Sequence, residues 1–342
     1  MAVVLMFLMM YRNPAGALMP DIPTKRLRAK PNGIINIMGY IGGAFATVLG
    51  IFLPLSDYIN VADRSDKLWI IEIPFVVASL LMTISAFVLF LTIKENKVVE
   101  EMKDQLAEGE RAAAIADAVT DDGKMSKKNR NMLLAILGAE ALWFMADNAI
   151  GTYIGNYVIY YLDSKSSATM ILTIIGGLAS VVGFATAGYI ADKIGRKWTV
   201  SSGLTLSFVA LLLMTFVKPS AEIVGANGEK AFPLILYVVW IIKGYGMALV
   251  HNCSFPMVVE LCSSKQIGKF TGYYYAASMS AQTLTPVLVG LILFRFKVWG
   301  ALPVYASVLL ALSAAVFILL VKNIKAIKLA NAKGLEALDA ED

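Results

Sequence analysis

Residues 167–190 read SATMILTIIGGLASVVGFATAGYI without a charged side chain, and the basic stretch ADKIGRK follows at 191–197. The hydrocarbon core of a bilayer requires about 20 consecutive apolar residues in a helix that crosses it. Lipid cannot hydrogen-bond to free backbone amides, so such a segment must be helical or belong to a closed barrel. Barrel strands alternate polar and apolar residues, and this run does not. We therefore predict a membrane-spanning helix that ends at a basic turn.

The rest of the chain has the same apolar character. Its residues are 58% hydrophobic and only 16% charged, and its mean hydropathy is +0.68. A water-soluble globule is excluded because too little polar surface remains to cover one. The expected fold is an all-α, polytopic membrane helix bundle. Nine spans are predicted, at about residues 2–19, 33–55, 69–93, 131–161, 167–190, 199–217, 234–252, 271–293 and 301–321.

A long charged connector divides these spans into three and six. Residues 94–130 are rich in acidic, basic and alanine residues, which favours a surface helix flanked by polar chain. The predicted organisation is a partial N-terminal bundle, the connector, a six-helix bundle and a tail. Their bounds are 1–93, 94–130, 131–322 and 323–342.

The basic residues of the loops predict the orientation of the chain. Lys and Arg are more frequent on the side that carries 191–197, the connector and the tail, and positive loops stay in the cytoplasm. We expect a multi-pass protein of the cell membrane, with residues 94–130 and the C-terminus cytoplasmic. Met1 would then lie outside without a basic lead-in, so we interpret it as an internal methionine of a truncated chain. A natural nine-span protein and a misplaced start codon are the alternatives.

The turn after residue 187 reads GYIADKIGRK, from Gly188 to Lys197. Gly188 would let two helices approach, and Asp192 would pair with Arg196 or with a helix end in one conformation only. Gly195 and the basic pair Arg196 and Lys197 complete this candidate conformational gate. A plain cytoplasmic turn is the alternative. The motif resembles the loop signature of the major facilitator superfamily, which implies two six-helix halves joined by a long loop, with the first three helices lacking here.

A narrower resemblance covers residues 11–43, YRNPAGALMPDIPTKRLRAKPNGIINIMGYIGG. This stretch looks like the fourth helix, basic loop and fifth helix of the glycoside-pentoside-hexuronide cation symporters and the sucrose-proton symporters. In the plant sucrose carriers an arginine directly precedes the Ala-Leu pair. Here Gly16 does so, and Arg12 lies about one turn earlier. The resemblance implies a sugar or glycoside as substrate.

Arg12 is a candidate contact for substrate or for a coupling carboxylate. An arginine in the middle of a span costs about 2.5 to 3.5 kcal/mol on insertion scales. Its side chain must therefore face a partner or a water-filled cavity. Alternatively, it lies near a helix end and extends to the membrane surface.

The span at 131–161 contains the candidate site residues Glu140, Trp143, Asp147 and Asn148. Seven residues turn a helix by about 700°, so Glu140 and Asp147 share one face with Trp143 between them. Carboxylates accept hydrogen bonds from sugar hydroxyls or take up a proton, and an indole stacks on a sugar ring. A structural ion pair near the cytoplasmic end is the alternative for Glu140.

The span at 234–252 adds Lys243 and His251. Their spacing of eight residues places them within about 80° on the helix. Lys243 is expected to neutralise Asp147 or Glu140 across the bundle. His251 is a candidate proton shuttle because imidazole titrates near neutral pH, although a structural histidine is the more frequent case.

Glycines are expected to mark close helix packing. They include two GxxxG pairs and three glycines of the 167–190 span, at Gly39, Gly43, Gly151, Gly155, Gly176, Gly177 and Gly183.

The motifs predict a transporter and no enzyme. We find no Ser/His/Asp set, no metal-spaced His or Cys cluster and no phosphate loop, and so expect no cofactor. Without a nucleotide motif, the energy must come from a gradient of H+ or Na+, which supplies about 2.3 kcal/mol per charge and 100 mV. The main hypothesis is a proton- or sodium-coupled sugar or glycoside symporter working by alternating access. An exporter of drugs or metabolites and a non-transporting remnant are the alternatives.

The expected partners follow from this reading. They are the lipid bilayer and a small-molecule substrate, with the protein as a monomer. The net charge of +5 is not arranged as a basic patch with interleaved aromatics, so nucleic acid is not expected.

Overall fold

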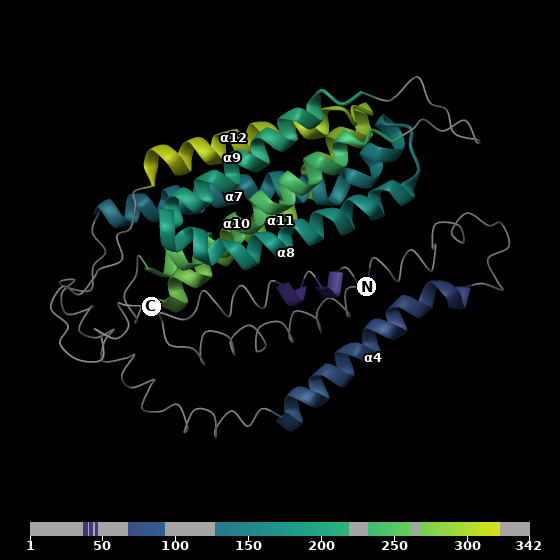
Figure 1. Ribbon diagram of the computed structural model, residues 1–342, viewed down its shortest axis with the longest axis horizontal. Coiled ribbons are helices and arrows are strands. Elements are labelled where there is room, and N and C mark those ends of the chain that lie inside the picture. The colour runs from purple at the N-terminus through teal and green to yellow at the C-terminus, as the bar shows by residue number, and fades with distance from the viewer. Residues whose placement is uncertain are drawn as a thin grey trace.

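In the computed structural model, all regular secondary structure of the described residues is helical (Figure 1). The structure describes residues 37–39, 41–43, 45–46, 68–92, 127–218, 232–260 and 267–321. Seven helices in these ranges are long and apolar enough to cross a membrane. The predicted span 69–93 is confirmed as α4 (Leu68–Thr92). Span 2–19 and most of span 33–55 lie outside the described residues, so the arrangement of nine spans as three plus six stays a prediction.

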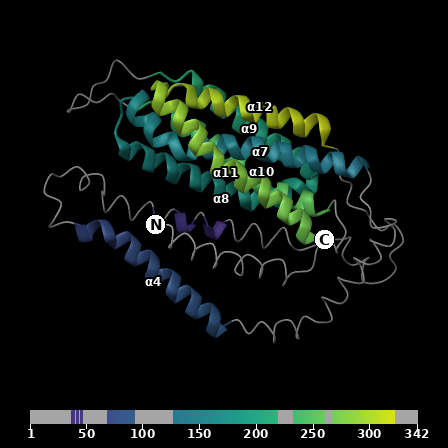
Figure 2. The ribbon, with the colours of Figure 1, turned by 180° about the vertical axis from the view of Figure 1, so that it is seen from behind.

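The six spans predicted after the connector are confirmed as helices. They are α7 (Lys127–Asn156), extended by the π-helical turn η1 (Tyr157–Tyr161), α8 (Ser166–Ile194), α9 (Arg196–Thr215), α10 (Ile235–Glu260), α11 (Ile267–Phe296) and α12 (Ala301–Leu320). Figure 1 shows them side by side with their long axes roughly aligned. In both views α4 lies apart from this bundle, and its most apolar stretch has no buried residue (Figure 2).

A single glycine separates α8 from α9. Gly195 has φ 86° and ψ 150°, a backbone conformation that side chains with a Cβ rarely adopt. Its N–H donates to the carbonyl of Ala191 at 2.9 Å, and its own carbonyl accepts from the N–H of Thr199 at 3.1 Å. The chain therefore reverses direction within one residue, and the two helices stay in contact.

The bundle has two ends because the helices alternate in direction. One end, called the Gly195 end, carries the start of α7, the turn at Gly195 and the end of α12. The ammonium group of Lys197 at the start of α9 donates to the carbonyl of Ile318 in the last turn of α12, at 2.9 Å. Helix α7 begins at the same end as the 188–197 turn, as the sequence predicts. The opposite end, called the Trp299 end, carries η1 and the turn before α12.

Helix α10 lies in the interior and packs most extensively on α8 and α9, while α12 packs on α7 and α9, and α11 on α7. Glycines allow the closest approaches of α10. A Cβ on Gly244 would collide with the backbone of Gly176, and one on Gly246 would lie 2.7 Å from the carbonyl oxygen of Gly203. These contacts explain why no larger residue fits at these positions of α8, α9 and α10.

For Gly151 and Gly155 the GxxxG prediction finds no close helix contact among the described residues, while for Gly39 and Gly43 it stays a prediction, because most residues around that pair lie outside the described ranges. A Cβ on Gly39, Gly43 or Gly151 would meet no atom within 4 Å, and one on Gly155 would make only ordinary contact with Thr169. The prediction for Gly176 is confirmed, since a Cβ there would lie 2.5 Å from the indole ring of Trp240.

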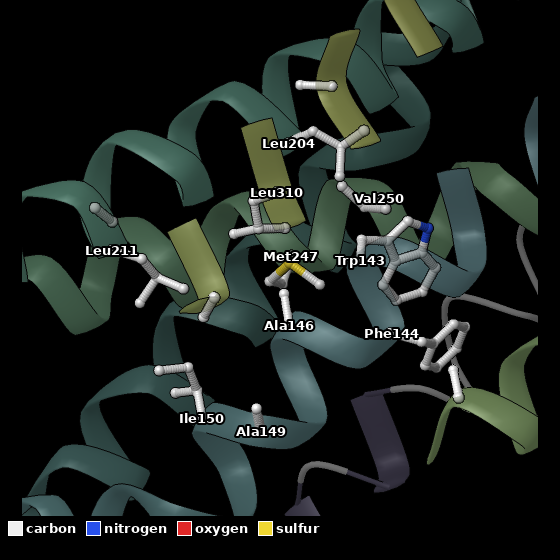
Figure 3. Packing of buried hydrophobic residues seen from close by; sticks show 14 of the residues in the cluster. Trp143, Phe144, Ala146, Ala149, Ile150, Leu204, Leu211, Met247, Val250 and Leu310 are labelled. Carbon is white, nitrogen blue, oxygen red and sulfur yellow. The ribbon is translucent and has the colours of Figure 1, made fainter. Parts of the chain in front are cut away.

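The core of the bundle is built from small and branched apolar side chains (Figure 3). In the close-up, Met247 of α10 lies among Ala146 of α7, Val250 of its own helix and Leu310 of α12. Many large apolar residues remain on the outer faces, such as Leu178 and Leu291, which are 63% and 65% exposed. An outer surface of this kind is suited to lipid.

Candidate functional site

Asp147 of α7 and Lys243 of α10 form an ion pair inside the bundle. The ammonium nitrogen of Lys243 lies 2.5 Å from Oδ1 of Asp147. The two side chains are 14% and 25% exposed, so the pair is largely removed from solvent. Asp147 lies near the middle of its apolar span, where an unpaired charge is strongly disfavoured. The sequence left open which acid Lys243 meets, and in the structure it is Asp147.

His251 lies about two turns after Lys243 on α10 and approaches the same carboxylate. Its Nε2 lies 3.9 Å from Oδ2 of Asp147, close enough for a charge interaction but too far for a hydrogen bond. Lys243 and His251 therefore face α7 together, as their spacing predicts. The three side chains are called the Asp147 centre below.

Two aromatic rings of α7 support the imidazole. The ring of Trp143 meets His251 edge to face, with centroids 4.6 Å apart, and Phe144 does so at 5.5 Å. Trp143 also stacks on Phe144 at 3.8 Å and is only 1% exposed. The indole therefore presents no open face to a sugar in this conformation, in contrast to the expectation, because it packs against His251 and Phe144.

Asn148 follows Asp147 on the same helix and is half-buried. Its amide nitrogen donates to the carbonyl of Phe144 one turn earlier, at 2.8 Å. This bond holds the side chain of Asn148 against its own helix.

Glu140 is fully buried, and neither of its carboxyl oxygens has a hydrogen-bond partner among the described residues. The alternative of a structural ion pair is therefore wrong, because no cation lies within pairing distance in the described structure. Tyr274 of α11 lies within electrostatic range of Glu140, and its hydroxyl shares a 3.0 Å hydrogen bond with Ser254 of α10.

The latch predicted at the 188–197 turn stays a prediction, and the structure gives the surroundings of its residues in one conformation. Gly188 faces open space, so it does not bring two helices together in the described structure. Asp192 is exposed, while Arg196 is half-buried and lies within electrostatic range of Asp192 and of Cys253 on α10. The bond that ties this turn to another helix comes from Lys197, which donates to the last turn of α12. A cation at that position also interacts favourably with the helix dipole.

Comparison with family models places these helices in a known group. The model of the Major Facilitator Superfamily matches residues 136–338. The chain belongs to the Major Facilitator Superfamily. This match begins within α7 and extends beyond α12, so the six-helix bundle is the part of the chain that carries the family signature. The comparison with curated proteins found no match.

Membership in the Major Facilitator Superfamily makes this chain a membrane transporter. An integral membrane protein in a lipid bilayer, with a small-molecule substrate, agrees with the apolar helices of the structure. The family match does not distinguish the narrower group of sugar symporters. Arg12, on which that resemblance partly depends, lies outside the described residues.

Two further polar contacts of this transporter were missed by the sequence reasoning. One is the bond between Ser254 and Tyr274, and the other is the bond from the hydroxyl of Tyr153 in α7 to the carbonyl of Pro286 in α11, at 2.5 Å. The proline at 286 was a usable signal, since proline lacks an N–H and perturbs the hydrogen bonds of its helix.

Proposed function

We propose that this protein is a symporter that takes up a sugar or glycoside together with H+ or Na+. The observation that carries the proposal is the Asp147 centre, a carboxylate, an ammonium group and an imidazole gathered at the middle of a membrane span. Ionisable groups at this depth are costly and are retained where they bind a substrate or an ion.

The chemistry of the Asp147 centre suits a polyol. A sugar hydroxyl donates to a carboxylate and accepts from an ammonium group at the same time. Hydroxyls of a bound sugar therefore replace the direct bond between Asp147 and Lys243 without leaving either charge unpaired. An apolar substrate has no hydroxyls that could replace the bond between Asp147 and Lys243. Its binding would therefore leave both charges buried and unpaired.

The burial of Trp143 refines this picture. An indole that packs against His251 fixes the position of the imidazole, so recognition relies on polar groups more than on a stacked ring. We assign Trp143 to positioning and the Asp147 centre to contact with the substrate.

Alternating access requires that the Gly195 end opens and closes. The hydrogen bond from Lys197 to the carbonyl of Ile318 joins α9 to α12 at that end in this conformation. We propose that it breaks when the bundle opens to the side of the connector, and that Arg196 and Asp192 exchange partners in the same step. Rocking of this kind is typical of transporters built from two helix bundles.

The test is uptake by proteoliposomes that contain the full chain. A panel of radiolabelled monosaccharides and disaccharides is offered under an imposed proton or sodium gradient. We expect gradient-driven accumulation of at least one sugar, and its loss in Asp147→Asn. Asp163→Asn is the matched control, because Asp163 is exposed in the loop at the Trp299 end and asparagine tolerates its positive φ of 54°.

The other outcomes separate the alternatives. A carboxylate beside an aromatic pair also attracts hydrophobic cations, so efflux of a fluorescent lipophilic cation would favour an exporter. The absence of flux for sugars and for cations in both directions would favour a non-transporting protein.

A further inference from the structure

We propose that Glu140 is the proton-binding site of the transport cycle, separate from the Asp147 centre. This inference rests on the proposed ion coupling and assigns it to one carboxyl group. Glu140 holds a proton while the bundle has the conformation described here, and releases it when rearrangement brings water to the carboxyl group.

The evidence is the environment of Glu140. Its side chain is 0% exposed, and both carboxyl oxygens lack a hydrogen-bond partner in the described structure. Buried polar groups normally have such partners, and an orphan of this kind calls for an explanation. An ionised carboxylate without a cation or a hydrogen bond is strongly disfavoured in an apolar interior, so the group is held as the neutral acid.

No described helix packed around Glu140 supplies a compensating charge. On α10, Lys243 and His251 are directed to Asp147. On α11 the Tyr274 hydroxyl lies within electrostatic range of Glu140 and shares its hydrogen bond with Ser254. On α12, Ser313 donates to the carbonyl of Ala139 at 2.8 Å.

Glu140 and Asp147 therefore behave differently although they share a face of α7. Seven residues at about 1.5 Å each place them roughly 10 Å apart along the helix. Asp147 stays ionised because Lys243 lies against it. Glu140 has no such partner, so its charge depends on access to water. Two carboxyl groups whose surroundings differ in this way take different roles in one cycle.

We assign the hydroxyl pair of Ser254 and Tyr274 to the point where water reaches Glu140. Ser254 follows His251 by about one turn of α10, and it is bonded to Tyr274, which lies near Glu140. In the proposed step, the O–H bond of Glu140 breaks, its proton passes to a water molecule that enters beside Tyr274, and the carboxylate remains.

The same geometry disfavours a sodium ion at Glu140. A hard cation requires several oxygen ligands around it. The second acid is about 10 Å away along α7, and the nearby hydroxyls of Ser254 and Tyr274 are bonded to each other. The ligand of this site is therefore a proton.

The first test needs no substrate. A hydrophobic carbodiimide reacts with protonated carboxyl groups in apolar surroundings, and mass spectrometry locates the adduct in the purified full-length protein in liposomes. We expect modification at Glu140 and not at Asp147 at neutral pH. The infrared spectrum of Glu140→Gln is expected to lack one carboxylic-acid band that the wild-type spectrum contains. Labelling of Asp147 instead, or loss of carboxylate bands in Glu140→Gln, would overturn the inference.

The second test separates coupling from binding. Its probe is whichever sugar the uptake panel described above identifies as a substrate. Glu140→Gln imitates the protonated acid at nearly constant size. We expect it to keep sugar exchange at equal concentrations, while accumulation driven by a pH gradient falls at least tenfold and loses its pH dependence. Asp147→Asn loses both activities.

The outcomes distinguish the two proposals. Full pH-driven accumulation by Glu140→Gln would refute the proton site and leave the symporter intact. Wild-type protein without any sugar flux would refute the symporter, while carbodiimide labelling still reports on Glu140. Should Glu140→Gln fail to fold, labelling of the wild-type protein decides alone.

Discussion

Replacing Asp147 by asparagine removes one partner of the ion pair and leaves the other in place. The ammonium group of Lys243, only 14% exposed, then has no carboxylate within pairing distance among the described residues. His251 cannot compensate, because a protonated imidazole would repel the ammonium. We expect Asp147→Asn to destabilise the bundle as well as to abolish transport.

The size of the effect follows from the burial of the pair. At 2.5 Å and an effective dielectric constant of about 20, two unit charges attract by roughly 7 kcal/mol before desolvation is counted. Removing one partner of a fully buried pair costs about 3 to 5 kcal/mol. Since Lys243 and Asp147 retain some exposure, the lower value of about 3 kcal/mol is expected.

The assay is a double-mutant cycle on thermal unfolding in detergent. The variants are Asp147→Asn, Lys243→Met and the two together, with Asp163→Asn as the control. In the double variant no charge is left unpaired, so its stability is expected to recover by about 2 kcal/mol relative to Asp147→Asn. Two results would refute this assignment. One is that the losses of the two single variants simply add in the double variant, and the other is that Asp147→Asn is as stable as Asp163→Asn.

Three further predictions concern the backbone and the Gly195 end, each measured by thermal unfolding in detergent. Gly244→Ala is expected to destabilise the bundle by about 1 to 3 kcal/mol, because its Cβ would collide with the backbone of Gly176. Gly151→Ala, where a Cβ meets no atom within 4 Å, is expected to stabilise it by about 0.5 to 1 kcal/mol, and equal shifts of the two variants would contradict this reasoning. Gly195→Ala is expected to lose about 1 to 2 kcal/mol from its positive φ, and an unchanged midpoint would argue against that backbone conformation. Lys197→Met is expected to lose about 0.5 to 1.5 kcal/mol with its bond to α12, while Lys218→Met, at an exposed lysine, serves as the control.

The sequence was sufficient for the helices because their signal is local. Length and hydropathy fix a span without knowledge of its neighbours, so α7 to α12 were predicted to within about four residues at their ends, except that α10 continues eight residues beyond the predicted end at 252. The break at Gly195 was equally visible, since a basic turn with a glycine lies between two apolar runs. Helical periodicity also predicted that Lys243 and His251 share a face.

The sequence was insufficient where the answer depends on which helices are neighbours. Gly151 and Gly155 have the spacing of a packing motif, yet among the described residues no helix packs closely on them, while Gly244 and Gly246 make very close contacts with α8 and α9. Spacing along one helix says that a groove exists but not that another helix fills it. The prediction that the indole of Trp143 stacks on a sugar failed to foresee its neighbours for a similar reason. Its ring is covered by His251 from α10 and by the adjacent residue Phe144.

Glu140 and Asp147 illustrate how tertiary contacts divide two residues that look equivalent in the sequence. Both are acids, on one face of one apolar helix, and periodicity assigns them the same role. The difference arises from α10, where a single lysine lies opposite Asp147 and, in the part of the chain that the structure describes, no cation lies opposite Glu140. A fixed negative charge holds a polar substrate, whereas a group that changes its charge can couple transport to a proton gradient. We therefore infer that Glu140, which has no cation beside it among the described residues, is the acid that responds to a proton gradient in the proposed cycle.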